Sequence, residues 1–160
     1  MAMTFDAVIV YTDGSSSKSR EGGWAALIAT QKNVTELVGW EDDTTNNRME
    51  MVAAIEGLKY IKKPSRVYLA SDSAYVINAI DKEWYKRWLS DEHQRPNLDL
   101  WTDLASLVEF HTIIPIKVKG HSNDLINRRV DKLAQQARKE KLSHIRKYTK
   151  AQMEAFTEPY

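Results

Sequence analysis

The chain has 160 residues, of which 42% are hydrophobic and 28% charged, and its formal net charge is +1. These values are typical of one domain that folds unaided, and they exclude disordered and collagen-like chains. The lack of cysteine excludes disulfides and thiolate metal sites. There is neither a secretory signal pattern nor an apolar run near the roughly 18 residues of a membrane helix. We therefore expect a cytoplasmic protein with no membrane association.

Three strands are predicted first. Residues 5–12 (FDAVIVYT) are rich in β-branched and aromatic side chains, as central strands are. Two further runs of this kind, 22–30 and 33–41, are joined by a short polar connection. This spacing predicts an antiparallel meander that starts with the first strand.

Helices and strands alternate in the rest of the chain. Apolar residues three or four apart in NRMEMVAAIEGLKYIKK predict a helix that ends before Pro64. The next predicted elements are a strand at 66–71, helices at 73–80 and 97–111, a strand at 113–120 and a helix at 126–141. From Arg138 onward the chain is polar and basic, and we expect a helical or frayed tail. The fold class is α/β, with a mixed sheet and helices on both faces.

Four acidic residues stand at the ends of these elements, and each has a purely structural alternative. Asp13 is suited to initiating a turn, and Glu50 to closing a capping box with Asn47. Asp72 is suited to capping a helix, and Asp131 to being a solvated charge. In an α/β sheet, however, ligands bind outside the strand ends, and carboxylates gathered there repel one another unless cations are present. Oxygen ligands without cysteine or paired histidine favour Mg²⁺ or Mn²⁺, which indicates phosphate chemistry.

Four segments carry a resemblance to a known family. YTDGSS, TTNNRMEMVAAIEGL, LASDSAYVINAI and VKGHSNDLINRRVDKLA resemble, in that order, the signatures of type 1 ribonuclease H, from about Ala7 to Ala137. The resemblance implies a five-stranded mixed sheet, with three antiparallel strands and then two parallel ones. It also implies hydrolysis of the RNA strand of an RNA/DNA hybrid, with 5′-phosphate and 3′-hydroxyl products. The expected division is a catalytic domain at 1–138 and a basic tail at 139–160.

The resemblance also implies the roles of individual residues. The family's metal-binding acids match Asp13, Glu50, Asp72 and Asp131, which would hold two Mg²⁺ about 4 Å apart, with Mn²⁺ as an alternative. His121 matches a mobile-loop histidine credited with proton transfer or product release, and the alternative is a solvated loop histidine.

Contacts with the hybrid follow from the same motifs. Asn46 and Asn47 match the pair that contacts the minor groove, where the 2′-hydroxyl is displayed. Ser15 would add contacts beside the metals, and Ser16 and Thr45 suit a pocket for a DNA phosphate. The alternative is a polar loop with a helix cap.

Residues 81–97 match the family's basic handle, whose aromatic side chains rest on the DNA strand. Trp84 and Trp88 are one helical turn apart, so they share a face. Balanced acids make this handle electrically neutral, and the alternative is that both tryptophans pack its base. Ala74 also replaces a glutamine common in the family, and the loop after Ser15 departs from it as well.

Positive charge is displaced to the C-terminal region. We hypothesise that this region partly replaces the neutral handle in attracting the hybrid. The alternative is a solvated helix face. The residues concerned are Arg128, Arg129, Lys132, Arg138, Lys139, Lys141, Arg146, Lys147 and Lys150.

Two rival functions remain open. A metal-dependent 3′ exonuclease usually has a second acid two residues after the first, but that position is Ser15 here. A non-catalytic hybrid-binding protein would have no need of all four acids. The expected partner is an RNA/DNA hybrid, and we expect a monomer with no obligate protein partner.

Overall fold

The structure is a computed structural model, and it describes residues 7–91, 95–119, 125–149 and 151–152. Six strands and five helices are formed by the described residues. In chain order they are β1 (Ala7–Ser16), β2 (Gly22–Ala29), β3 (Asn33–Glu41), α1 (Asn46–Tyr60), β4 (Arg66–Ser71), α2 (Ala74–Asp81), α3 (Trp84–Ser90), α4 (Leu98–Phe110), β5 (Thr112–Lys117), α5 (Leu125–Glu140) and β6 (His144–Thr149).

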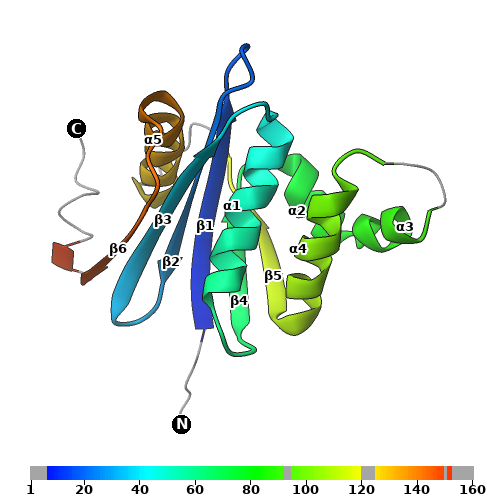
Figure 1. Cartoon of the computed structure of the whole chain (residues 1–160). Coiled ribbons are helices and arrows are strands. Elements are labelled where there is room, and N and C mark those ends of the chain that lie inside the picture. The colour runs from blue at the N-terminus through cyan, green and yellow to red at the C-terminus, as the bar shows by residue number, and fades with distance from the viewer. Residues whose placement is uncertain (1–6, 92–94, 120–124, 150, 153–160) are drawn as a thin grey trace, which may run out of the picture.

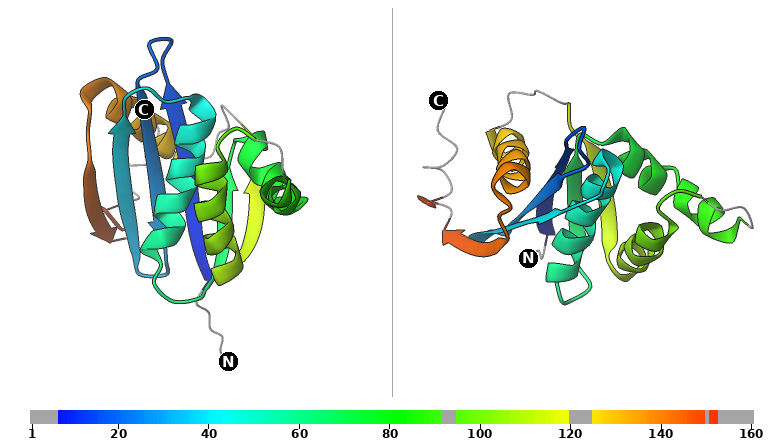
Figure 2. Two further views of the ribbon diagram at one scale, coloured as in Figure 1. Left: turned by 45° about the vertical axis from the view of Figure 1, so that its right-hand side comes forward. Right: turned by 45° about the horizontal axis from the view of Figure 1, so that its top comes forward.

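The strands form one mixed sheet in the order β5-β4-β1-β2-β3-β6. Strand β1 lies at its centre, antiparallel to β2 and parallel to β4. Helices α1 and α4 cover one face of the sheet, and α5 covers the other (Figures 1 and 2). The predicted mixed α/β sheet with helices on both faces is therefore confirmed. None of the helices in the described ranges has the length and apolarity needed to cross a membrane.

The strand count differs from the prediction because the tail adds a sixth strand. Helix α5 ends near Lys141, whose positive φ of 53° reverses the chain, and β6 then pairs antiparallel with β3. The prediction of a helical or frayed tail is wrong for residues 144–149. Basic side chains are common on edge strands, where they discourage pairing with other chains. The same basic composition conceals the strand in the sequence.

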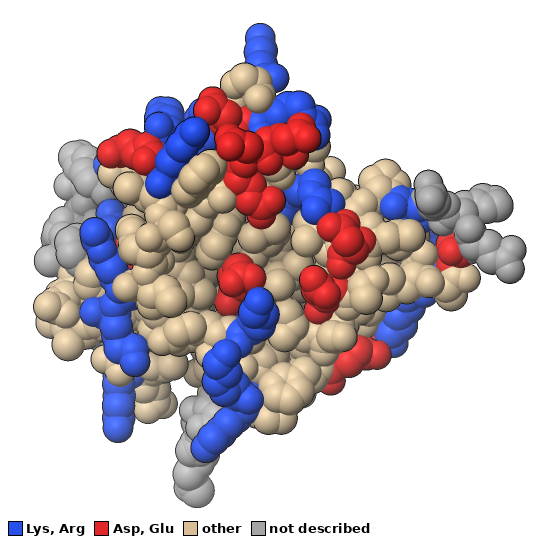
Figure 3. Space-filling model, viewed as in Figure 1, with Lys and Arg blue, Asp and Glu red and all other residues tan. Residues whose placement is uncertain are grey.

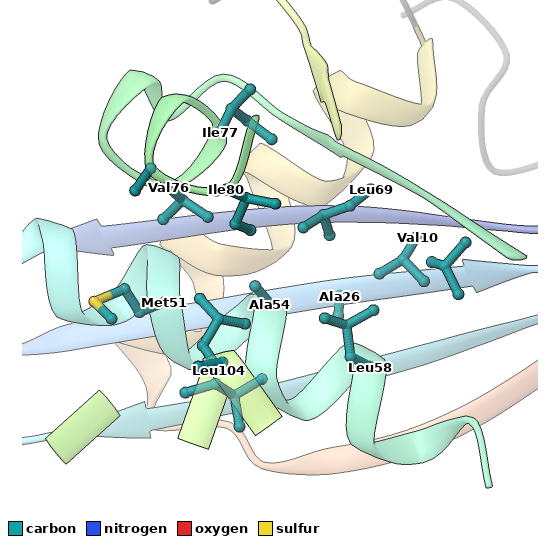
Figure 4. Packing of buried hydrophobic residues seen from close by; sticks show 14 of the residues in the cluster. Val10, Ala26, Met51, Ala54, Leu58, Leu69, Val76, Ile77, Ile80 and Leu104 are labelled. Atoms are coloured by element: carbon teal, nitrogen blue, oxygen red, sulfur yellow. The ribbon is translucent and has the colours of Figure 1, made fainter. Parts of the chain in front are cut away.

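Two apolar layers hold the helices on the sheet. On the α1 face, side chains from α1, α2 and α4 meet those of the strands, as Figure 4 shows for Leu58, Ile80 and Leu104. On the other face, α5 contributes a stripe of small and medium side chains. A Cβ on Gly23 would collide with the backbone of α5, so this glycine lets the helix approach β2 closely.

Candidate active site

Three carboxylates meet where β1, β4 and α1 converge. The side chains of Asp13, Glu50 and Asp72 each offer an oxygen atom, and these three atoms all lie within 4.8 Å of one another. Asp13 and Glu50 are buried, with 5% and 4% of their surface exposed, whereas Asp72 is half-buried. Three acids from three elements therefore converge as the sequence predicted, and they do so away from bulk water.

The fourth acid joins them from the opposite face of the sheet. Asp131 is half-buried on α5 and lies in contact with the Asp13 carboxyl. Gln135, one turn later on the same helix, donates a hydrogen bond from Nε2 to Asp131 Oδ2 at 3.3 Å. Asp131 is thus an oriented acid beside the cluster rather than a freely solvated charge.

The structural alternatives for Glu50 and Asp72 are not realised. Thr45 caps α1, because its hydroxyl accepts a hydrogen bond from the Arg48 N–H at 3.2 Å. Likewise Ser73, not Asp72, caps α2 by accepting from the Val76 N–H. Neither acid therefore caps a helix, and both carboxylates belong to the cluster with Asp13.

Asp13 does not initiate a turn either. Strand β1 continues through it to Ser16, and Asp13 pairs with Ala25 on β2. The carboxylate therefore projects from a paired strand in the middle of the sheet. The structural alternative for Asp13, a turn at the end of the strand, is therefore not realised.

Glu50 is aimed by two donors. The Gly14 backbone N–H donates to Glu50 Oε1, and the Ser71 hydroxyl lies 3.5 Å from Oε2. This contact is possible because Gly14 has no side chain, since a Cβ there would collide with the backbone of Met49 and Glu50. The Asp-Gly pair thus serves the close approach of α1 to β1.

Burial raises the pKa values of two of these acids, Asp13 and Glu50. Burial, followed by the neighbouring Glu50, raises the pKa of Asp13 far above its ordinary value. Burial also raises the pKa of Glu50, to about 7. Protons would therefore compete with a cation for these carboxylate oxygens. Such a buried oxygen-only donor set fits a hard divalent cation, which would relieve the repulsion.

The expected substrate-binding residues surround the acids. Asn46 and Asn47 are exposed at the first turn of α1, next to Thr45, and Ser16 is half-buried at the end of β1. Ser15 Oγ accepts a hydrogen bond from Arg138 Nε at 3.0 Å. Arg138 thereby places a positive charge at Ser15, two residues after Asp13 on β1.

The two handle tryptophans pack together, as the structural alternative required. Trp88 stacks on Tyr75 at 6.0 Å and meets the edge of the buried Trp101 at 5.3 Å between ring centroids. Trp84 lies 6.3 Å from Trp88 and carries Lys82 over its ring. Both tryptophans are half-buried, so part of each remains exposed. Their contact with DNA stays a prediction.

Some residues of the site were not found in the sequence, and one lies beyond the structure. Gln135 was detectable, because it is four residues from Asp131 on a predicted helix. The roles of Gly14 and Ser71 had no sequence signal, since they depend on how α1 meets the sheet. His121 lies outside the described residues.

Comparisons with known proteins identify the family of this chain. The sequence profile of the RNase H family matches residues 6–139. Ribonuclease H of Chlorobium phaeobacteroides (strain DSM 266) is 44% identical over 81% of this chain and 94% of its own length. Ribonuclease H of Caldicellulosiruptor saccharolyticus is 41% identical over 83% and 97%. These relatives define the class as a nuclease. Within that class, the chain belongs to the RNase H family of ribonuclease H enzymes.

Two solved structures share the fold. LC9-RNase H1, described as a type 1 RNase H with the type 2 active-site motif, superposes with a TM-score of 0.76 over 97% of this chain and 83% of its own. The N-terminal RNase H domain of a Mycobacterium tuberculosis protein gives 0.68 over 84% and 94%. Both are 22% identical to this chain, so they support the architecture alone.

Proposed function

We propose that this protein is an endoribonuclease that hydrolyses the RNA strand of RNA/DNA hybrids and leaves 5′-phosphate and 3′-hydroxyl ends. The observation that carries the proposal is the buried cluster of Asp13, Glu50 and Asp72, with Asp131 beside it. The cluster lies where β1, β4 and α1 meet, in a chain of the RNase H family.

The four acids would hold two Mg²⁺ ions, or Mn²⁺ in their place. When bound, such ions activate a water and stabilise the departing 3′ oxygen. The protein's own part is to place the ligands. The Gly14 N–H orients Glu50, which would contact both the cations and the RNA, and Gln135 holds Asp131. His121 would assist proton transfer or product release.

Choice of the hybrid would rest on the residues around the acids. Asn46 and Asn47 would sense the 2′-hydroxyl in the minor groove. Thr45 and Ser16 would form a pocket for a DNA phosphate, and Ser15 would contact the backbone beside the metals. Trp84 and Trp88 would support the DNA strand from the handle.

The proposed catalytic unit spans residues 1–138, with the basic tail as part of the electrostatic footprint. Two of the positive side chains of the handle, Lys86 and Arg95, form ion pairs with acids of the same segment, which fits a neutral handle. On the α1 and α4 face, acidic side chains gather near one end of the molecule, and basic ones form columns nearer the other (Figure 3). Replacing the exposed Arg146 and Lys147 by glutamine should flatten the salt dependence of hybrid binding, and an unchanged slope would remove the tail from the footprint.

The decisive experiment compares four substrates with Mg²⁺: an RNA/DNA hybrid, single-stranded RNA, double-stranded RNA and double-stranded DNA. Only the hybrid should be cut. Asp13→Asn and Asp72→Asn should abolish cleavage, whereas Asp99→Asn, an exposed acid on α4, should not. Equal cleavage of all four substrates, or full activity of the two site variants, would refute the proposal.

The same assay separates the rival functions. A hybrid whose RNA 3′ end is blocked should still be cut internally, whereas a 3′ exonuclease would leave it intact. A non-catalytic binding protein would retain the hybrid without cleaving it. We further propose a cytoplasmic monomer without an obligate protein partner, which sedimentation of the purified chain would test for the oligomeric state.

A further inference from the structure

A buried carboxylate outside the active site joins the catalytic helix to the C-terminal strand. Glu36 lies in β3 and is 0% exposed. Its Oε1 accepts hydrogen bonds from Arg129 Nη2 of α5 at 3.1 Å and from the Tyr148 hydroxyl of β6 at 3.3 Å. Its Oε2 lies 2.6 Å from His144 Nε2, also on β6. A buried charge with partners on two other elements fixes the relative positions of those elements.

The apolar contacts of α5 come from one stripe along the helix. The helix faces the sheet with Val130, Leu133, Ala134 and Ala137. Its backbone lies directly over Gly23, where no side chain of β2 projects to engage it. Leu27 of β2 and Val34 and Val38 of β3 belong to the same apolar layer. Polar contacts on the flanks of α5 add to the orientation that this layer gives the helix.

Two polar contacts hold α5 on opposite flanks. Arg129 and Asp131 are two positions apart, about 200° around the helix, so they face opposite ways. Arg129 reaches Glu36 on the β3 side, whereas Asp131 faces Asp13 on the β1 side. Arg138 contacts Ser15 on that same β1 side. Releasing the Glu36 contact would let α5 turn, and Asp131 would move with it.

We infer that Glu36 is a positioning residue for catalysis: through Arg129 it sets the rotation of α5 and thereby the place of Asp131 among the metal-binding acids. The strand β6 completes the arrangement through His144 and Tyr148. This strand lies beyond the segment that the RNase H profile matches, residues 6–139. The inference rests on the proposed metal-dependent function and gives the C-terminal strand a part in it.

The first test is Glu36→Gln, which keeps the shape of the side chain and removes its charge. We expect Mg²⁺ half-saturation to weaken about 10- to 100-fold, the range seen when a residue that orients a metal ligand is changed. The hybrid KM should stay unchanged while kcat falls. Mg²⁺ binding is measured separately, without substrate, as the rise in thermal midpoint with added Mg²⁺.

A second variant guards against simple loss of folding. In Glu36→Met with Arg129→Met, the whole pair is replaced by apolar side chains of similar length, an exchange that buried ion pairs often tolerate. This double variant removes one positive and one negative charge, so its net charge is unchanged, and weaker Mg²⁺ binding in the folded protein supports positioning. Leu104→Ala, at a buried position of α4 on the other face of the sheet, is the control for destabilisation alone.

The outcomes separate the inference from the proposed function. The positioning role would be overturned if the folded double variant bound Mg²⁺ and cleaved the hybrid as wild type does. It would also be overturned if Leu104→Ala weakened Mg²⁺ binding as much as the Glu36 variants do. If wild type cuts no hybrid but the Glu36 variants still weaken Mg²⁺ binding, the proposed function fails and the positioning role stands.

Discussion

Gly14 donates its backbone N–H to the Glu50 carboxylate, and the missing side chain of Gly14 lets α1 approach β1 closely enough for this contact. A Cβ at this position would lie against the backbone of Met49 and Glu50, which cannot rotate away as a side chain can. The glycine therefore couples the strand that carries Asp13 to the helix that carries Glu50.

Gly14→Ala should lower both stability and activity. We expect a loss of about 1–3 kcal/mol in the free energy of unfolding, as for overpacking elsewhere, and about a 100-fold loss of kcat because Glu50 is displaced. Urea unfolding and hybrid cleavage measure the two effects. Gly39→Ala is the control, because its Cβ would meet the Trp24 side chain rather than the backbone of α1. It should lose stability but keep kcat; equal kcat losses in both variants would contradict a specific role for Gly14.

Neutralising Asp13 should stabilise the metal-free protein. The pKa values of Asp13 and Glu50 are raised in the folded state, so folding retains protons that the unfolded chain has released. Stability without metal should therefore fall as the pH rises from 4.5 to about 7, the interval set by the Glu50 pKa. Asp13→Asn should raise the free energy of unfolding at neutral pH by about 1–3 kcal/mol.

Asp99→Asn is the control for this charge effect, and its change in stability should have the opposite sign. The pKa of Asp99 is lowered to about 2 by its hydrogen bonds with Arg48, so its ionised form is favoured in the folded state. Asp99→Asn should lower stability slightly at neutral pH, as expected for an exposed pair. Urea unfolding in EDTA, repeated with Mg²⁺, measures both. A destabilised Asp13→Asn variant in EDTA would contradict the predicted repulsion.

Arg138→Gln should weaken hybrid binding in a salt-dependent way. The Ser15 hydroxyl accepts a hydrogen bond from this guanidinium, two residues along β1 from Asp13, where a backbone phosphate would pass if the substrate lies over the acids. Loss of one phosphate contact should reduce the slope of log affinity against log salt by about 1. Lys59→Gln is the matched control, because Lys59 lies in the last turn of α1, far along the helix from Glu50. Equal slopes for Arg138→Gln and wild type would exclude the phosphate contact.

The two handle tryptophans should separate into different roles. Trp88→Ala should cost about 2 kcal/mol of stability, because Tyr75 and Trp101 pack on it, and Trp88→Phe should recover much of this. Trp84→Ala should chiefly raise the hybrid KM, since aromatic stacking on a base contributes about 1–3 kcal/mol. Thermal unfolding and steady-state kinetics distinguish them. An unchanged KM for Trp84→Ala would assign both tryptophans to packing.

The elements with strong local patterns were predictable. The bounds of β3 and β4 agree with the predicted strands, and α1, α4 and α5 differ from their predictions by a few residues at most. The spacing of apolar residues along a strand or a helix is a local property, so the sequence displays it directly. The four acids were predictable for a related reason: they stand beside the ends of such elements, in motifs that resemble one family.

The sequence by itself determined the fold class, the main elements and the identity of the four acids. Only the tertiary structure decided that Asp13 projects from within β1, that residues 144–149 form a strand, and that Glu36 is buried. His144 meets Glu36 across 108 residues of chain, and Arg129 meets it across 93. Such contacts depend on which surfaces the sheet brings together, and no local periodicity encodes them. The basic tail therefore looked like a solvated segment in the sequence, whereas pairing with β3 makes residues 144–149 the sixth strand.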